Sequence, residues 1–155
     1  MDIRRLPENL INQIAAGEVV ERPSSALKEL IENSIDADAT QIDITIDNGG
    51  KNLISVSDNG IGIKKNLIPM AIERHATSKL PNNDLNKIAY LGFRGEALPS
   101  IAAVSELNIQ TKFIDSHQAW SLDVAAGNFN EAYPSSRQIG TIISVKKLFY
   151  ATPAR

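Results

Sequence analysis

Cysteine is absent from the 155-residue sequence, and histidine occurs only twice. Without cysteine the chain can form neither a disulfide framework nor a thiolate metal site. His75 and His117 are too few for a dedicated zinc site. Any bound metal is therefore expected to have oxygen ligands, as magnesium does.

Long apolar runs are also missing. No stretch approaches the roughly 18 residues that a membrane-spanning helix needs, and residues 1–7 lack the apolar segment of a signal peptide. We therefore expect a cytoplasmic protein with no membrane partner. The net charge of −2 gives no general electrostatic reason to bind DNA, although it does not exclude a local basic groove.

Two glycine-rich nucleotide motifs do not occur in the sequence. There is no G-x-x-x-x-G-K-[ST] of a P-loop, and no glycine fingerprint joins a strand to a helix as in a Rossmann unit. The composition, 43% hydrophobic and 22% charged, is that of an ordinary globular chain without repeats or linkers. We expect one folding unit that is neither a P-loop nor a Rossmann protein.

Helical spacing dominates the first part of the chain. Residues 7–20 are predicted to form one helix, and a second is expected from about Ser24 or Ser25, where a serine can cap the first turn. The stripe of this second helix that is expected to face the core comprises Leu27, Leu30, Ile31, Ser34 and Ile35.

Alternation with a period of two follows. Residues 42–47 and 54–56 alternate around an Asn48-Gly49-Gly50 turn, which predicts a hairpin with one buried face. Further elements are expected along the rest of the chain: helices at residues 64–74 and 96–104, and strands near residues 107–109, 120–124 and 143–145. Together they predict an α+β two-layer sandwich, with a mixed, mostly antiparallel sheet and helices on one face.

The second helix carries the first candidate chemistry. At about 100° per residue, Glu29, Asn33 and Asp36 fall opposite the apolar stripe. This band is either an ordinary solvated face, or an amide and a carboxylate that bind magnesium and orient water. The pair Asn33-Ser34 favours the second interpretation, because both are weaker helix formers than an exposed face selected for stability would contain.

Asp58 shares strand parity with Ile54 and Val56, so its carboxylate is expected to face the core. A buried acid must be hydrogen-bonded. Asp-Asn-Gly is also a common turn sequence, and a turn explains it equally well. The functional alternative is that Asp58 accepts a hydrogen bond from the adenine amine, while Gly60 and Gly62 let the base approach the backbone.

A third stretch, Gly92-Phe93-Arg94-Gly95-Glu96-Ala97-Leu98, places two glycines before a predicted helix. The first-turn amides and the dipole of such a helix favour an anion. Upstream, residues 74–79 supply hydroxyl and cationic groups. Each stretch alone also fits an ordinary loop or a solvated basic surface.

Taken in order, five stretches resemble the MutL family of DNA mismatch repair proteins, within the GHKL superfamily of gyrase B, Hsp-type chaperone ATPases and histidine kinases. They are ELIENSIDA at 29–37, DNGIG at 58–62, RHATSK at 74–79, GFRGEAL at 92–98, and GT at 140–141 with LFYATPAR at 148–155. The first two mark only the superfamily, whereas RHATSK, GFRGEAL and the TPAR ending are specific to the MutL branch. The resemblance covers essentially the whole chain and implies the GHKL (Bergerat) form of the sandwich.

The resemblance implies a role for each matching residue. Glu29 would be the general base of ATP hydrolysis and Asn33 the Mg²⁺ ligand. Asp58 would read adenine, assisted by Thr141 through water. The other residues implied to contact the nucleotide, mostly its phosphates, are Gly60, Gly62, Thr77, Ser78, Lys79, Gly92, Phe93, Arg94, Gly95, Glu96, Ala97 and Leu98.

The same resemblance implies an ATP-dependent switch. Residues 80–91 would form a lid that orders over ATP and reopens after hydrolysis. Closure would drive homodimerisation, with residues 1–20 reaching across the interface. Turnover would relay a mismatch signal from MutS to a downstream nuclease and helicase on bacterial chromosomal DNA.

Three departures qualify the match. Asp38 replaces the usual glycine after the first motif, and Ala151 replaces a common asparagine. The chain also ends at Arg155, so residues 1–155 are interpreted as a truncated N-terminal GHKL domain without its transducer and C-terminal dimerisation domains. Such a piece is expected to hydrolyse ATP poorly. Two other interpretations stay open: a GHKL ATPase with another task, such as a topoisomerase subunit or chaperone, and a non-catalytic scaffold.

Overall fold

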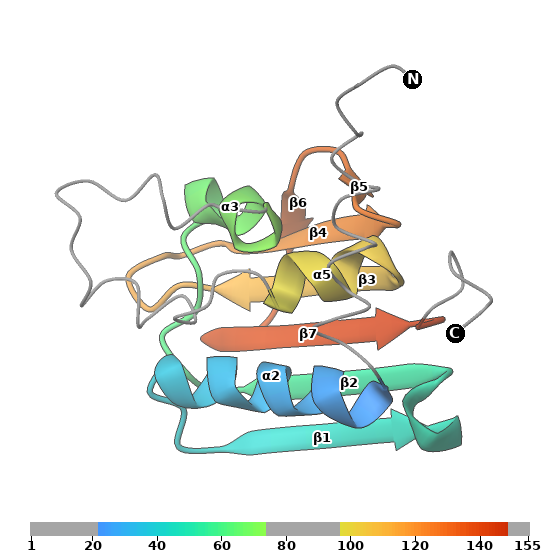
Figure 1. The fold of residues 1–155 in the computed structure, drawn as a ribbon. Coiled ribbons are helices and arrows are strands. Elements are labelled where there is room, and N and C mark those ends of the chain that lie inside the picture. Colours follow the sequence, from blue (N-terminus) through green and yellow to red (C-terminus); the bar gives the residue numbers. More distant parts are fainter. Residues whose placement is uncertain (1–21, 74–96, 149–155) are drawn as a thin grey trace, which may run out of the picture.

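The computed structural model describes residues 22–73 and 97–148. In this part of the chain one antiparallel sheet forms one layer and helices form the other, on a single face of the sheet (Figure 1). The helices are α2 (Pro23–Asp36), α3 (Ile68–Ile72) and α5 (Ala97–Ala103), with short 3-10 turns η1 (Asn48–Gly50) and η2 (Lys65–Leu67).

Among the described residues the sheet has seven strands, in the order β1-β2-β7-β3-β4-β5, and β6 also pairs with β4. The strands are β1 (Ile42–Asp47), β2 (Leu53–Asp58), β3 (Glu106–Lys112), β4 (Ala119–Ala125), β5 (Asn128–Phe129), β6 (Tyr133–Ser135) and β7 (Gly140–Lys146). All pairings between these strands are antiparallel. The predicted α+β sandwich is therefore confirmed.

The last strand lies in the middle of the sheet. β7 inserts between β2 and β3, and its register places Thr141 opposite both Asp58 and Thr111. Residues far apart in sequence thus meet at one end of three neighbouring strands. This insertion is what assembles the site described below.

Helix α2 begins one residue before the predicted serine cap. Pro23 occupies its first turn, and Arg22 at the N-cap makes no side-chain capping bond, so the serine-cap prediction was wrong. The buried line consists of Ala26, Leu30 and Ser34 rather than the whole predicted stripe. Ala26 and Ser34, one turn before and one turn after Leu30, are the small residues of this line.

The remaining apolar residues of α2 lie on one flank of the helix. Leu27 and Ile31 are half-buried and Ile35 is 59% exposed, so the expectation that Ile35 faces the core was wrong. On β1, Ile44 and Ile46 are also 45% and 48% exposed. They share a face with the core residues of β2, but β1 is the edge of the sheet and α2 packs over β2. Only the β2 half of the hairpin has the predicted fully buried face.

The region predicted as one helix at 64–74 is divided. Lys64 is extended, η2 follows, and α3 begins anew with Pro69 in its first turn. α5 agrees with the helix predicted at 96–104, whereas β5 and β6 were not predicted because each is only two or three residues long. The predicted helix at 7–20 and lid at 80–91 lie outside the described residues.

The core lies between the helices and the sheet. Its largest fully buried aliphatic side chains are Leu30, Ile54, Ile68, Ile101, Val104, Ile109, Leu122, Val124 and Val145. Within residues 22–73 and 97–148, no helix is long and apolar enough to cross a membrane.

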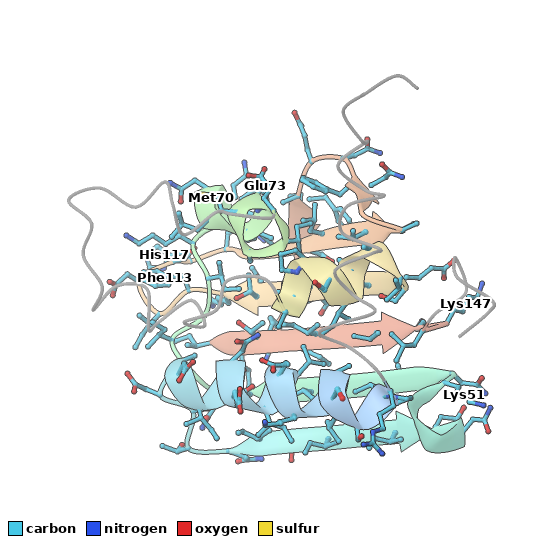
Figure 2. The ribbon with its side chains drawn as sticks, viewed as in Figure 1. Lys51, Met70, Glu73, Phe113, His117 and Lys147 are labelled. Carbon is cyan, nitrogen blue, oxygen red and sulfur yellow. The ribbon has the colours of Figure 1, made fainter. Side chains whose placement is uncertain are left out.

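Two cation–π contacts join η2 and the residue before it to one end of the sheet. Lys65 Nζ lies 4.2 Å from the centre of the Trp120 ring, and Lys64 Nζ lies 5.3 Å from that of Phe113. Figure 2 shows Phe113 and His117, from the β3–β4 connection, at the opposite end of the sheet from Lys51 and Lys147. These contacts therefore hold Lys64 and η2 against the end of the sheet at which β3 ends and β4 begins.

Candidate functional site

Asp58, the last residue of β2, is 8% exposed, which confirms its predicted core-facing parity. Its Oδ2 accepts a hydrogen bond of 2.7 Å from the Ser34 hydroxyl. Its Oδ1 accepts from the amides of Gly60, at 2.9 Å, and Thr141, at 3.3 Å. These three donors, from α2, the β2 loop and β7, explain how an acid is tolerated there.

The turn interpretation of Asp58 accounts for only part of its contacts. The Gly60 amide contact is the local turn interaction expected of Asp-Asn-Gly. The Ser34 and Thr141 contacts are long-range and belong to no turn. A carboxylate has about four lone-pair positions, so three donors leave about one acceptor position on Asp58 for a further donor.

Ser34 is a site residue whose role was missed. It is 3% exposed and ties α2 to β2 through its bond to Asp58. In the sequence it appeared only as a weak helix former within an apolar stripe. The signal that could have identified it is its place in that stripe, because a buried hydroxyl needs a polar partner.

Glu29 and Asn33 lie one turn apart on a flank of α2. With Ala26, Leu30 and Ser34 on the sheet, the right-handed helix turns Glu29 and Asn33 toward α5, and Leu27, Ile31 and Ile35 toward β1 (Figure 1). α2 and α5 are in contact. The polar band is therefore on the side of α2 that faces the middle of the molecule, and both residues are half-buried rather than fully solvated.

Asp36 completes the predicted polar band. Partial burial and, to a smaller extent, the charge of Glu32 raise the pKa of the Asp36 carboxyl.

Asp38, the departure from the family pattern, adopts a left-handed backbone with φ of 63°. The Ala39 amide bonds to the Ser34 carbonyl across this turn, at 3.2 Å. The turn thus forms without glycine.

Gly60 and Gly62 pack against the protein's own backbone. A Cβ on Gly60 would lie 2.6 Å from the Ala37 carbonyl oxygen, and one on Gly62 would lie 2.1 Å from that of Lys112. Gly62 also has a φ of 78°. The glycines are therefore required by the approach of this loop to the end of α2 and to β3, whatever the loop binds.

Thr141 lies beside Asp58 and is 5% exposed. Its hydroxyl oxygen is 2.8 Å from that of Thr111, which is fully buried on β3. From the other side, Arg137 donates to the backbone carbonyl of Asp58, at 3.3 Å. Burial lowers the pKa of the Arg137 guanidinium, and the nearby Asp58 charge partly offsets this. Neither Thr111 nor Arg137 was a candidate from sequence.

The predicted phosphate-binding residues are mostly outside the described part of the chain. Ala97 and Leu98 are described, and both are buried at the start of α5. The residues that lie outside it are Thr77, Ser78, Lys79, Gly92, Phe93, Arg94, Gly95 and Glu96.

The described residues contain no group of three or more histidine and carboxylate side chains that could enclose a metal ion. Mg²⁺ usually keeps several waters and takes few protein ligands when it accompanies phosphates. Asn33 can supply such a ligand.

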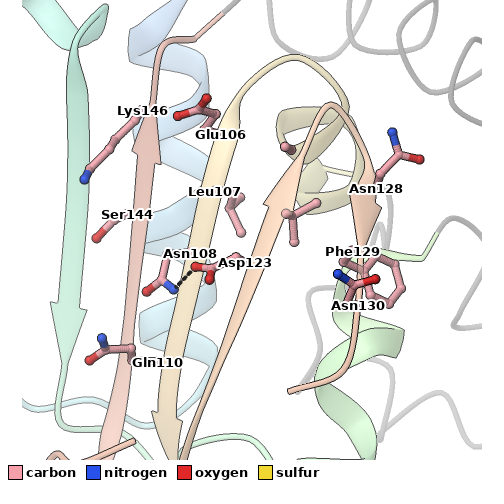
Figure 3. A pocket seen from close by; sticks show the side chains of 12 residues that line it. Glu106, Leu107, Asn108, Gln110, Asp123, Asn128, Phe129, Asn130, Ser144 and Lys146 are labelled. Carbon is pink, nitrogen blue, oxygen red and sulfur yellow. Dashed lines mark hydrogen bonds between the residues drawn. The ribbon is translucent and has the colours of Figure 1, made fainter. Parts of the chain in front are cut away.

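A separate groove of about 750 Å³ lies on the open face of the sheet. Side chains of β3, β4 and β7 project into it, and Asn108 donates to Asp123 across it at 2.7 Å (Figure 3). Glu106 and Lys146 lie near its end. None of the predicted nucleotide residues lines this groove, so it is distinct from the site around Asp58.

A family model described as "Histidine kinase-, DNA gyrase B-, and HSP90-like ATPase" matches residues 21–148. The chain belongs to this family, as its sheet, its covering helices and the Asp58 loop indicate. Within the family, its similarity is to MutL proteins. "DNA mismatch repair protein MutL" of Paramagnetospirillum magneticum (strain ATCC 700264 / AMB-1) is 55% identical over 155 residues, which are 100% of this chain and 26% of that protein.

Solved structures agree. The "N terminal domain of a DNA repair protein" is 32% identical with a TM-score of 0.77, covering 97% of this chain and 44% of that one. The "Aquifex aeolicus MutL ATPase domain complexed with ADP" is also 32% identical, with a TM-score of 0.65 and coverages of 88% and 46%. The resemblance to the MutL family and the GHKL fold are thus confirmed, while the chain spans about a quarter of the first curated relative.

Proposed function

We propose that this chain forms the nucleotide-binding part of a MutL-type DNA mismatch repair ATPase. The observation that carries the proposal is the buried Asp58 carboxylate. It accepts hydrogen bonds from three donors of the protein, which leaves about one of its four lone-pair positions for a donor of the ligand. The exocyclic amine of adenine is a donor of the right kind for that position. The ADP complex of the similar Aquifex aeolicus domain supports a nucleotide as the ligand.

Each proposed role uses a different element. Asp58 reads the adenine amine and Thr141 assists through water. On α2, Asn33 offers an amide oxygen to Mg²⁺ and Glu29 acts as general base on the attacking water. The flank of α2 that carries Glu29 and Asn33 faces α5, whose start holds Ala97 and Leu98 of the phosphate motif. This placement supports hydrolysis between the two helices.

The wider switch is proposed from the family resemblance. ATP would order the lid at 80–91 and promote homodimerisation, and hydrolysis would reverse both. The protein would then pass a mismatch signal from MutS to a nuclease and helicase on DNA in the bacterial cytoplasm. We assign residues 1–155 to the N-terminal ATPase domain of that longer protein.

The test is Mg²⁺-dependent ATP turnover by the full-length protein with Glu29→Ala. Loss of a general base is expected to reduce turnover about 10²–10⁴-fold while ATP still binds, because the proposed role of Glu29 is at the attacking water and not at adenine. Glu32→Ala is the matched control, since Glu32 is exposed on the outer side of the same helix, 3.9 Å from Lys28. Unchanged turnover in Glu29→Ala would reject the assignment of the base.

A further inference from the structure

Thr111 is a fully buried hydroxyl that belongs to none of the nucleotide motifs. It lies near the end of β3, directly opposite Thr141 in the sheet. Its Oγ1 accepts a hydrogen bond from the Ile63 amide at 2.8 Å, and lies 2.8 Å from Thr141 Oγ1 and 3.1 Å from the Gly140 carbonyl oxygen. One hydroxyl thus joins the loop after Asp58 to two residues of β7.

The number of protons at this hydroxyl limits what it can do. A threonine hydroxyl has one proton and two lone pairs, and the Ile63 amide occupies one lone pair of Thr111. The single proton of Thr111 can go to the Gly140 carbonyl or to Thr141. In the first arrangement, Thr141 must use its own proton to make the 2.8 Å contact with Thr111.

In the second arrangement, Thr111 donates to Thr141 and the proton of Thr141 is free. A free proton on Thr141 can be donated to an acceptor beside Asp58, directly or through water. Hydrogen bonds in such a chain polarise and strengthen one another. The contact to Thr141, at 2.8 Å, is also shorter than the one to the Gly140 carbonyl, at 3.1 Å.

We propose that Thr111 is a positioning residue for base recognition, which donates to Thr141 so that Thr141 in turn donates toward the nucleotide base. The proposal rests on the proposed function and deepens it. Adenine presents an amine donor next to a ring-nitrogen acceptor, and guanine presents the reverse. Asp58 as acceptor and Thr141 as donor match adenine, and Thr111 holds Thr141 in the donor state.

The contact with Ile63 adds a second effect. The Ile63 amide is part of the loop that carries Gly60 and Gly62, and this loop approaches Ala37 and Lys112 closely. Removing the Thr111 hydroxyl leaves that amide without the partner it has here. The loop and Thr141 are therefore expected to lose their alignment together.

The experiment measures ATP and GTP affinity of the full-length protein by calorimetry, with Thr111→Val and Thr111→Ser. The valine variant keeps the shape of threonine but has no hydroxyl. It is expected to bind ATP about tenfold more weakly, which corresponds to about 1.4 kcal/mol, and to prefer ATP over GTP less strongly. The serine variant keeps the hydroxyl and should bind ATP within about twofold of the original.

Turnover separates positioning from catalysis. Because the contacts of Thr111 are with Ile63, Gly140 and Thr141 rather than with the proposed general base, Thr111→Val should raise KM for ATP and leave kcat within about threefold. Ser121→Ala is the matched control: Ser121 is a buried hydroxyl on neighbouring β4, bonded to Asn108 at 2.9 Å, and its loss should change neither ATP affinity nor selectivity.

Several results would overturn the proposal. Thr111→Val binding ATP with the original affinity and selectivity would do so, and so would a tenfold loss in Thr111→Ser. If Thr111→Val does not fold, Thr141→Val and Thr141→Ser supply the comparison, because the relay requires a hydroxyl at position 141. Equal ATP/GTP selectivity in these two variants would reject both the relay and the proposed role of Thr141. If the unsubstituted protein binds no adenine nucleotide, the proposed function is rejected together with the role of Thr111. If it binds ATP and Thr111→Val binds ATP equally well, only the role of Thr111 is rejected.

Discussion

Replacing Gly62 with alanine tests the close approach of the Asp58 loop to β3. Gly62 has a φ of 78°, and a Cβ there would lie 2.1 Å from the Lys112 carbonyl oxygen. Gly49 provides the matched comparison, because its φ of 62° is similarly left-handed but no atom lies within 4 Å of its Cβ position. The pair thus separates backbone strain from steric overlap.

The two substitutions share one cost and differ in another. A non-glycine residue in the left-handed region costs about 1–2 kcal/mol, and this applies to both positions. Forcing extra atoms into a packed site adds about 1–3 kcal/mol, and this applies only to Gly62, since the atom in its way is a backbone carbonyl. We therefore expect a loss of about 1–2 kcal/mol for Gly49→Ala and about 2–5 kcal/mol for Gly62→Ala.

Urea unfolding measures both losses as free energies, with the single tryptophan, Trp120, as fluorescent probe. The urea midpoint of Gly62→Ala should fall well below that of Gly49→Ala, without a change in the slope of free energy against urea. Equal losses in the two variants, within about 0.5 kcal/mol, would refute the packing argument and leave only backbone strain.

Three further substitutions test local electrostatics. Burial, and to a smaller extent the charge of Glu32, raise the pKa of Asp36, so the folded state binds this proton more tightly than the unfolded state. The contribution of Asp36 to stability therefore falls as the pH rises from the ordinary aspartate pKa through the raised one. Asp36→Asn should therefore have a slightly higher urea midpoint at pH 7 and no advantage near pH 3; a lower midpoint at pH 7 would contradict this. Lys65→Gln should cost about 0.5–1 kcal/mol and change the emission of Trp120, whereas Lys64→Gln, whose partner is Phe113, should leave that emission unchanged.

Local patterns predicted much of the fold. Three predicted features depend only on residues close in sequence, and the structure has all three. They are the period-two hairpin, the core-facing side chain of Asp58 and the helix that begins at Ala97. The errors are at positions where neighbours in space decide. Ile44 and Ile46 have a core-like pattern but belong to an edge strand, and Ile35 lies outside the buried line of Ala26, Leu30 and Ser34.

The candidate site shows the same division. Glu29, Asn33, Asp58 and the two glycines are recognisable because their chemistry and spacing are local properties of the chain. Ser34 gives a weak local signal, as a hydroxyl within an apolar stripe. Thr111 gives none, because an alternating strand residue shows nothing of the β7 residues that will lie beside it.

The amino-acid sequence by itself determined the fold class, the family resemblance and the order of the chemical groups, because periodicity, glycine placement and motif spacing are written along the chain. Only the tertiary structure decided how those groups are held. The insertion of β7 between β2 and β3 brings Thr141 and Thr111 to Asp58, and the packing of α2 on β2 brings Ser34 to its carboxylate. Hydrogen bonds between residues 24 to 83 positions apart depend on strand order and register, which no local pattern contains.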